Sequence, residues 1–166
     1  MRDNRGVTLI ELIVVMAIMA ILAIGTTVGY NLLGFGSAES TVKRIDAMLQ
    51  YVRLENMTKS ETYYMMIEQA GEHYYLSVIE ATNDVDRKVI SREKLGLKKG
   101  KITYQAGASF YSINSSSALE VGFRKDTGGI KGNSEGQIIS SIKVSATGRT
   151  CTIRLVELTG KHYIEG

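Results

Sequence analysis

Residues 5–25 read RGVTLIELIVVMAIMAILAIG, and this stretch decides the fold. All eighteen residues from Val7 to Ile24 are apolar except Thr8 and Glu11. A helix of this length extends about 27 Å, close to the hydrocarbon thickness of a bilayer. No second run of this kind follows, so no buried core can enclose it, and the helices of soluble proteins carry a polar face. The stretch therefore predicts a membrane helix.

Glu11 and Gly6 make this stretch more than a generic anchor. An ionisable residue at the centre of a membrane helix costs about 2.5–3.5 kcal/mol, so Glu11 is a candidate functional residue. The alternative, that Glu11 lies near the interface and snorkels, is disfavoured because its side chain is short. Gly6 separates the basic residues 1–6 from the apolar run. No small-residue cleavage site of the secretory type follows Ile24, so the basic–apolar junction is the better place for a cut.

The block GVTLIEL, residues 6–12, resembles the cleavage and methylation signal of bacterial type IV prepilins and type II secretion pseudopilins. The resemblance implies that prepilin peptidase, a membrane aspartyl peptidase, cuts between Gly6 and Val7 and that Val7 is then N-methylated. It also implies that Glu11 pairs with an N-terminal amine during filament assembly. Val7 stands where the family more often has Phe. Loss of residues 1–6 lowers the net charge from +3 to +2, because they hold two arginines and one aspartate.

The same resemblance implies where the chain acts and with which partners. Its partners are other pilin or pseudopilin subunits, contacted through the N-terminal helix, together with the inner-membrane assembly platform and membrane lipid. The chain starts as a single-pass protein of the bacterial cytoplasmic (inner) membrane, with its head outside the cytoplasm. After assembly it lies in a periplasmic or cell-surface filament.

Beyond Ile24 the apolar pattern loosens into a glycine-marked segment, residues 25–36. Glycine lowers helix stability by about 1 kcal/mol per site relative to alanine. This segment therefore either unwinds when the subunit leaves the membrane or only bends the helix. From Ser37 onward, apolar residues recur at helical spacing, which predicts an amphipathic helix. The stripe consists of Ala38, Val42, Ile45, Leu49 and Val52.

From Glu61 the period of the apolar pattern changes to two, which is typical of strands. Residues 62–69 and 73–80 flank Ala70-Gly71 and predict a β-hairpin. A glycine-rich loop covers residues 124–136. The other predicted strands cover residues 85–91, 101–105, 109–113, 119–123, 138–145, 150–157 and 161–164. Short strands at this spacing predict an antiparallel sheet or a small sandwich.

The chain therefore divides into four parts. These are a leader (1–6), a transmembrane and polymerisation helix (7–29), the amphipathic second half of the long helix (30–60) and a β-rich head (61–166). The predicted fold class is α+β, with a long N-terminal helix packed on an antiparallel β-rich globular head, the type IV pilin architecture in outline. Residues 119–129, 138–155 and 159–164 resemble the head of the H-type minor pseudopilin, which favours a minor subunit.

The sequence holds no constellation of catalytic residues. His73 and His162 lie outside any metal-ligand spacing, so we expect exposed or edge-strand histidines. Cys151, the one cysteine, alternates with apolar residues and is expected to face the core. The glycine-rich loop lacks phosphate-loop spacing, and Asp126 lacks the spaced oxygen ligands of a calcium loop. We therefore expect no enzyme, no metal and no cofactor.

Two functions remain in competition. The first is a structural subunit of a type IV pilus or type II secretion pseudopilus. The second is a tip minor pilin that binds DNA during competence, with DNA as a possible partner bound in a salt-dependent manner. The tyrosines of the hairpin, Tyr63, Tyr64, Tyr74 and Tyr75, favour sheet and core roles over base stacking. The basic residues that would line a DNA groove are Lys94, Lys98, Lys99, Lys101, Arg124, Lys125, Lys131, Arg149, Arg154 and Lys161.

Overall fold

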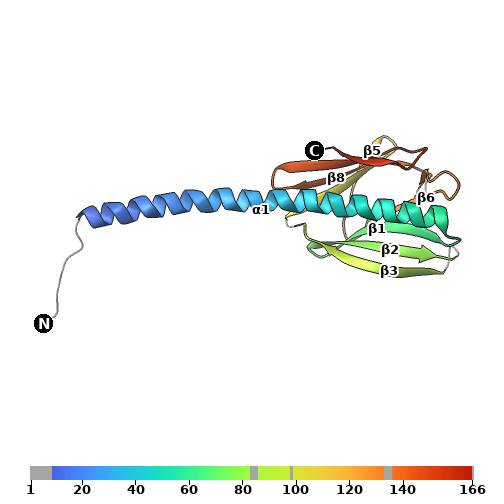
Figure 1. Cartoon of the computed structure of the whole chain (residues 1–166), viewed down its shortest axis with the longest axis horizontal. Helices are drawn as coiled ribbons and strands as arrows, with labels where there is room; N and C mark the ends of the chain where they lie inside the picture. The colour runs from blue at the N-terminus through green and yellow to red at the C-terminus, as the bar shows by residue number, and fades with distance from the viewer. Residues whose placement is uncertain (1–8, 83–85, 98, 133–135, 166) are drawn as a thin grey trace.

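One long helix and a two-sheet head make up the chain (Figure 1). The computed structural model describes residues 9–82, 86–97, 99–132 and 136–165. Within the helix α1, which spans Leu9–Thr58, the side chains of residues 9, 11 and 20–37 lie outside this description. The class is α+β, with antiparallel sheets and a helix.

Each sheet of the head has five antiparallel strands. The first has the order β3-β2-β1-β6-β7 and the second the order β10-β9-β8-β4-β5. The strands of the first sheet are β1 (Thr62–Ala70), β2 (His73–Ala81), β3 (Arg87–Leu95), β6 (Leu119–Phe123) and β7 (Ile130–Lys131). Those of the second are β4 (Gly100–Ala106), β5 (Ser109–Ser112), β8 (Ile139–Ala146), β9 (Arg149–Leu155) and β10 (His162–Glu165).

The predicted hairpin is confirmed, because β1 and β2 pair from Thr62↔Ala81 to Ala70↔His73 around Gly71. Gly71 has a φ of 61°, a left-handed conformation that glycine adopts without steric cost. Two predictions of strand position were wrong. The strand β3 runs four residues further than residue 91, because it completes a ladder with β2 that ends at Tyr74↔Leu95. The loop expected at 124–136 contains the short β7, which pairs with β6.

The amphipathic stripe of α1 is buried between the two sheets. All five of its residues, from Ala38 to Val52, have no exposed surface. The sequence predicted a helix packed on a β-rich head, and α1 does pack on the head but contacts both sheets. It contacts β1, β2 and β6 of the first sheet and β8, β9 and β10 of the second. The stripe is therefore the centre of one continuous core shared by both sheets.

The strand directions give the head two distinct ends. The helix enters the head at Ala38 and runs to Thr58, and β1 then runs back alongside it. The β1–β2 turn, the end of β3, the start of β4 and the β8–β9 turn therefore lie at the end of the head next to the protruding part of α1, and we call this the helix-exit end. An electrostatic interaction between α1 and the start of β9 agrees with this arrangement. The pKa of Glu39 is lowered chiefly by its hydrogen bond from Lys43, and the nearby charge of Arg149 adds to this shift.

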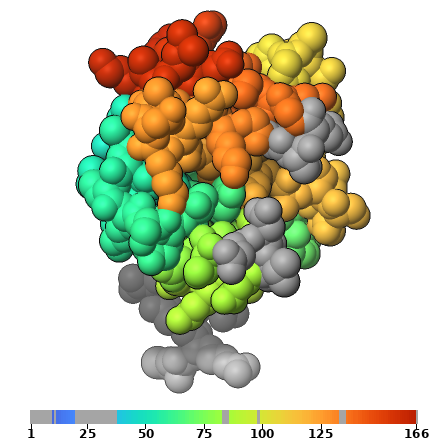
Figure 2. Space-filling view, turned by 90° about the vertical axis from the view of Figure 1, so that its right-hand side faces the viewer, coloured from blue at the N-terminus to red at the C-terminus, as the bar shows by residue number. Residues whose placement is uncertain are grey.

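At the opposite end, the last turn of α1 meets the loop after β6 and the segment after β9 (Figure 2). The backbone N–H of Arg124 donates to Gly129 O at 2.7 Å, and that of Ile130 donates to Glu157 O at 2.8 Å. Lys125 Nζ also donates to the carbonyl oxygen of Ser60, just beyond α1. These bonds tie the three segments into one end of the head.

Candidate functional site

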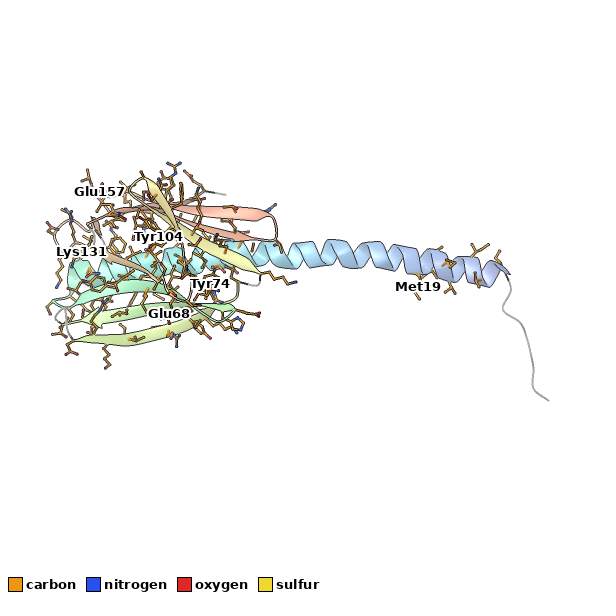
Figure 3. The ribbon with its side chains drawn as sticks, turned by 180° about the vertical axis from the view of Figure 1, so that it is seen from behind. Met19, Glu68, Tyr74, Tyr104, Lys131 and Glu157 are labelled. Carbon is orange, nitrogen blue, oxygen red and sulfur yellow. The ribbon has the colours of Figure 1, made fainter. Side chains whose placement is uncertain are left out.

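The first part of α1 presents an apolar surface that the head does not cover. Its large apolar side chains from Ile10 to Met19 that the structure describes are 50–71% exposed. Met19 lies on the part of α1 that extends beyond the head (Figure 3). A contiguous exposed apolar surface of this kind marks a site of contact with a membrane or another protein. The same helix therefore has one apolar region satisfied by the head and another that requires an external cover.

The predicted processing and assembly residues lie at the start of this region. Gly6 and Val7 lie outside the described residues. Glu11 belongs to the first turn of α1 by its backbone, but its side chain lies outside the description. Cleavage, methylation and amine pairing therefore stay predictions. Over the residues that were described, no helical stretch is both long enough and apolar enough to cross a membrane.

Residues 1–27 match the prokaryotic N-terminal methylation motif. The matched segment of this methylation motif includes Gly6, Val7 and Glu11 and part of the uncovered surface of α1. No curated protein and no solved structure matches the chain. The methylation motif supports a type IV pilin-like subunit of a pilus or pseudopilus, and it points to a structural subunit rather than an enzyme. It implies processing by prepilin peptidase and assembly with other pilin subunits.

Within the head, His162 fastens the last strand to the helix. Its side chain is 3% exposed, and Nε2 lies 3.4 Å from Asp46 Oδ1 and 3.2 Å from the carbonyl oxygen of Asp46. The other ring nitrogen, Nδ1, lies 3.1 Å from the carbonyl oxygen of Gly160. We expected exposed or edge-strand histidines. His162 does lie on an edge strand, but its imidazole is buried because β10 packs against α1, whereas His73 is exposed.

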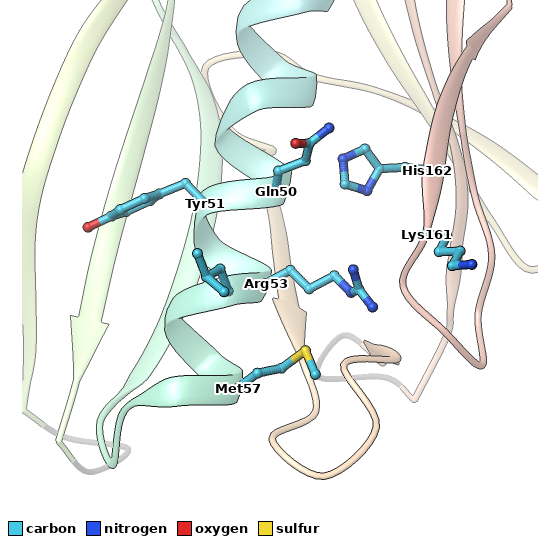
Figure 4. A pocket seen from close by; sticks show the side chains of 7 residues that line it. Gln50, Tyr51, Arg53, Met57, Lys161 and His162 are labelled. Carbon is cyan, nitrogen blue, oxygen red and sulfur yellow. The ribbon is translucent and has the colours of Figure 1, made fainter.

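An open groove of about 500 Å³ runs between α1 and the start of β10 (Figure 4). Arg53 extends across it, and its Nε donates to the carbonyl oxygen of Gly128 at 3.2 Å. Tyr51 points away from Arg53 and His162, toward the other side of the helix. The residues that line the groove are Gln50, Tyr51, Arg53, Leu54, Met57, Lys161 and His162. Two polar side chains of the groove hold the helix to the head, Arg53 through Gly128 and His162 through Asp46.

The hairpin tyrosines alternate between the core and the outer face of the first sheet. Tyr63 and Tyr74 are buried, at 3% and 4% exposure. Burial raises the pKa of Tyr63, and its hydrogen bond to Glu80 contributes. On the outer face, Arg92 lies 4.3 Å from the ring centroid of Tyr75. The tyrosines are therefore sheet and core residues, as predicted.

The described residues offer no metal centre. Among them, no group of three or more His, Cys, Asp or Glu side chains is placed to hold a metal ion. Cys151 is half-buried on β9 and packs against the core, in agreement with its alternation in the sequence.

The basic residues proposed for DNA binding do not line one groove. Lys99, Lys101 and Arg149 lie at the helix-exit end, where Gly100 pairs with Ala146. Arg124, Lys125 and Lys131 lie at the opposite end, and Figure 3 shows Lys131 far from the protruding part of α1. A nine-residue strand such as β1 separates the two ends by about 27–30 Å. Arg154 is paired with Glu165 at 3.0 Å, and Lys98 lies outside the described residues.

Proposed function

We propose that this chain is a structural, minor subunit of a type IV pilus or type II secretion pseudopilus. In this proposal the chain is cut between Gly6 and Val7, N-methylated at Val7 and assembled into a filament through residues 7–29. The head, residues 61–166, stays outside the cytoplasm and is held by the amphipathic second half of the helix, residues 30–60.

One observation carries the proposal: the methylation motif adjoins an apolar helical surface that the head leaves uncovered. A bilayer covers such a surface before assembly, and the apolar helices of neighbouring subunits cover it in a filament. The inner-membrane assembly platform would move the subunit from the bilayer into the filament. In contrast, the head completely covers the five side chains of the stripe from Ala38 to Val52, so the two apolar regions of one helix serve different purposes.

The assignment as a minor subunit rests on the organisation of the head. After β6, a loop leads to the short β7, the β8–β9 hairpin follows further along the chain, and Thr159-Gly160 precedes β10. Gly160 packs on the loop, since a Cβ there would lie 1.9 Å from the carbonyl oxygen of Gly128. This closure lies in the stretches whose sequence pattern resembles the H-type minor pseudopilin, and the proposal of a minor subunit rests on that pattern.

Glu11 selects the axial position of each new subunit in this proposal. A carboxylate in an apolar setting requires a partner, and cleavage creates a cationic amine on Val7, four residues away along the helix. Methylation leaves that amine charged. Pairing between Glu11 of one subunit and the amine of a neighbour forms only at one offset, and little water screens it.

The variant Glu11→Val tests the proposal. The run becomes more apolar, so membrane insertion should persist and cleavage should be largely unchanged, whereas recruitment into filaments should fall. The measurement compares the amounts of subunit in sheared-filament and membrane fractions. Glu39→Val is the matched control, because Glu39 is an exposed acidic residue of the same helix beyond the apolar run. Filament levels of Glu11→Val equal to wild type would overturn the assembly role.

Processing is tested by the intact mass of the protein taken from its native membrane. The expected chain begins at Val7 and carries one methyl group. A mature protein that keeps residues 1–6 would exclude cleavage at Gly6, and with it the amine on which the pairing depends.

A further inference from the structure

The helix-exit end of the head carries a rim of basic side chains. Lys94 pairs with Tyr75 next to the end of the β2–β3 ladder, Lys99 and Lys101 flank the start of β4, and Arg149 begins β9. All four are exposed, and we call them the basic rim. The rim therefore places four exposed positive charges where α1 leaves the head.

Few acidic side chains offset this rim among the described residues nearby. Glu39, on α1, is already paired with Lys43 at 2.7 Å. Glu72 lies in the β1–β2 turn. The opposite end differs, because there Lys59 pairs with Glu55 and Arg87 pairs with Glu120. Near the rim, Glu68 and Glu93 lie 2.7 Å from Arg92 and 3.8 Å from Arg44, respectively. Among the described residues of the helix-exit end, basic side chains therefore outnumber acidic ones.

Part of the rim surrounds a hollow that suits a phosphate group. Lys99, Lys101 and Arg149 line an open pocket of about 400 Å³ together with the β8–β9 turn. Ser145 and Thr150 also line it, and their hydroxyl oxygens lie 2.9 Å apart. Cationic side chains and hydroxyl groups are the groups that bind phosphate oxygens.

The sequence of α1 places this end of the head next to the membrane in the proposed function. The predicted transmembrane helix ends at residue 29, and nine further residues, about 14 Å of helix, lead to Ala38. No charged residue occurs from Leu12 to Ala38, and the first charged residues after this run, Glu39 and Lys43, lie at the helix-exit end. The basic rim is therefore on the side of the head that faces the lipid headgroups.

We propose that the basic rim docks the head on the anionic phospholipid surface of the membrane that holds α1, before the subunit enters a filament. This inference rests on the proposed function, since it requires the apolar part of α1 to lie in the bilayer. Each basic residue near such a surface favours the docked head about fivefold. Docking fixes the orientation of the head relative to the membrane and keeps the rim covered until assembly lifts the subunit out.

The test measures how fast an amine-reactive reagent modifies individual lysines, using the full chain in lipid nanodiscs that hold one copy. One set of discs contains zwitterionic phosphatidylcholine alone, and the other contains about 30% anionic phosphatidylglycerol. We expect Lys99 and Lys101 to react at least about fivefold more slowly in the anionic discs. Lys88 and Lys125, at the opposite end, serve as internal controls and should react equally in both. The protection should disappear in about 1 M salt, where the Debye length is about 3 Å.

Two arginine variants sharpen the result. Arg149→Glu reverses one charge of the rim and should reduce the protection of Lys99 and Lys101 by about fivefold or more. Arg124→Glu makes the same change at the opposite end and should leave the protection intact. Equal protection in both variants would count against the rim as the docking surface.

Other outcomes identify a different ligand. Equal reactivity of Lys99 in the two kinds of disc overturns the inference. If inorganic phosphate protects Lys99 and Lys101 in zwitterionic discs, the pocket binds a free anion. If these lysines are protected only in discs that hold two copies of the chain, the rim contacts a neighbouring subunit. Either result overturns membrane docking. A chain that enters discs without protection of the rim leaves the proposed function standing. A chain that does not enter discs at all overturns the proposed function, and this inference with it.

Discussion

The side chain of Asn56, on the last turns of α1, pairs with the backbone of Tyr63 at the start of β1. Its Nδ2 donates to the carbonyl oxygen of Tyr63 at 2.7 Å, and its Oδ1 accepts from the N–H of Tyr63 at 3.0 Å. Nδ2 also donates to the carbonyl oxygen of Val52 at 2.9 Å. Asn56 is 1% exposed, so these backbone groups have no access to solvent as an alternative. The side-chain amide of Asn56 therefore links the helix to the first strand of the sheet by hydrogen bonds.

Replacing Asn56 should therefore destabilise the head strongly. Asn56→Ala leaves the buried N–H and C=O of Tyr63 unsatisfied, at about 1–3 kcal/mol for each group. Asn56→Asp keeps the acceptor for the N–H but loses both donors, so it should also destabilise the head. The measurement is the free energy of unfolding of the full chain in detergent by chemical denaturation. A change within about 0.5 kcal/mol for Asn56→Ala, the range of ordinary surface substitutions, would contradict this role.

The glycine that closes the chain onto the loop after β6 should tolerate no side chain. Gly160 has a φ of 62°, and a Cβ there would meet Gly128 O at 1.9 Å. Gly148 has a φ of 81° but nothing within 4 Å of its Cβ position, which makes it a matched control. Gly148→Ala should cost only the conformational term, about 1–2 kcal/mol. Gly160→Ala adds a backbone clash and should cost more, as read from the midpoint of thermal unfolding. If the two variants lose the same stability, the loop around Gly128 moves to accept the new side chain without further loss.

The buried stripe and the exposed face of α1 should respond differently to truncation. Ile45→Ala opens a cavity at a residue with no exposed surface and should cost about 2–5 kcal/mol. Leu54→Ala removes a similar aliphatic side chain that is 60% exposed on the same helix, and should cost well under half as much. Denaturation of both variants in the same detergent provides the comparison. Similar losses for the two would mean that the helix does not pack as described.

Tyr63 should make the head sensitive to alkaline pH. Burial and the hydrogen bond to Glu80 raise the pKa of Tyr63, so the folded state holds this proton more tightly than the unfolded state. The contribution is fully present below the unfolded tyrosine pKa of about 10 and is lost as the pH rises through the folded pKa. From about pH 9 to about pH 11, wild type should therefore lose more unfolding free energy than Tyr63→Phe. If wild type and Tyr63→Phe lose the same unfolding free energy over this pH range, Tyr63 is not the cause of the alkaline sensitivity.

The sequence by itself determined the features that depend on local periodicity. The apolar run after Gly6, the stripe from Ala38 to Val52 and the β1–β2 hairpin around Gly71 follow from spacing and turn chemistry alone. The methylation motif is likewise a contiguous block, so it was readable before any contact was known. Each of these features lies within one contiguous segment of helix or one hairpin.

Only the tertiary structure decided the contacts between distant segments. His162 meets Asp46 across 116 positions of sequence, and Arg53 meets Gly128 across 75. The stripe of α1 serves two sheets rather than one, because strand order depends on pairings such as β1 with β6 that no local pattern encodes. The same strand order carried Lys99 and Arg149 to the helix-exit end and Lys131 to the other, dividing a set of charges that the sequence presents as one group. Side-chain spacing specifies which residues face a core; which sheet that core joins is set by long-range hydrogen bonding and packing.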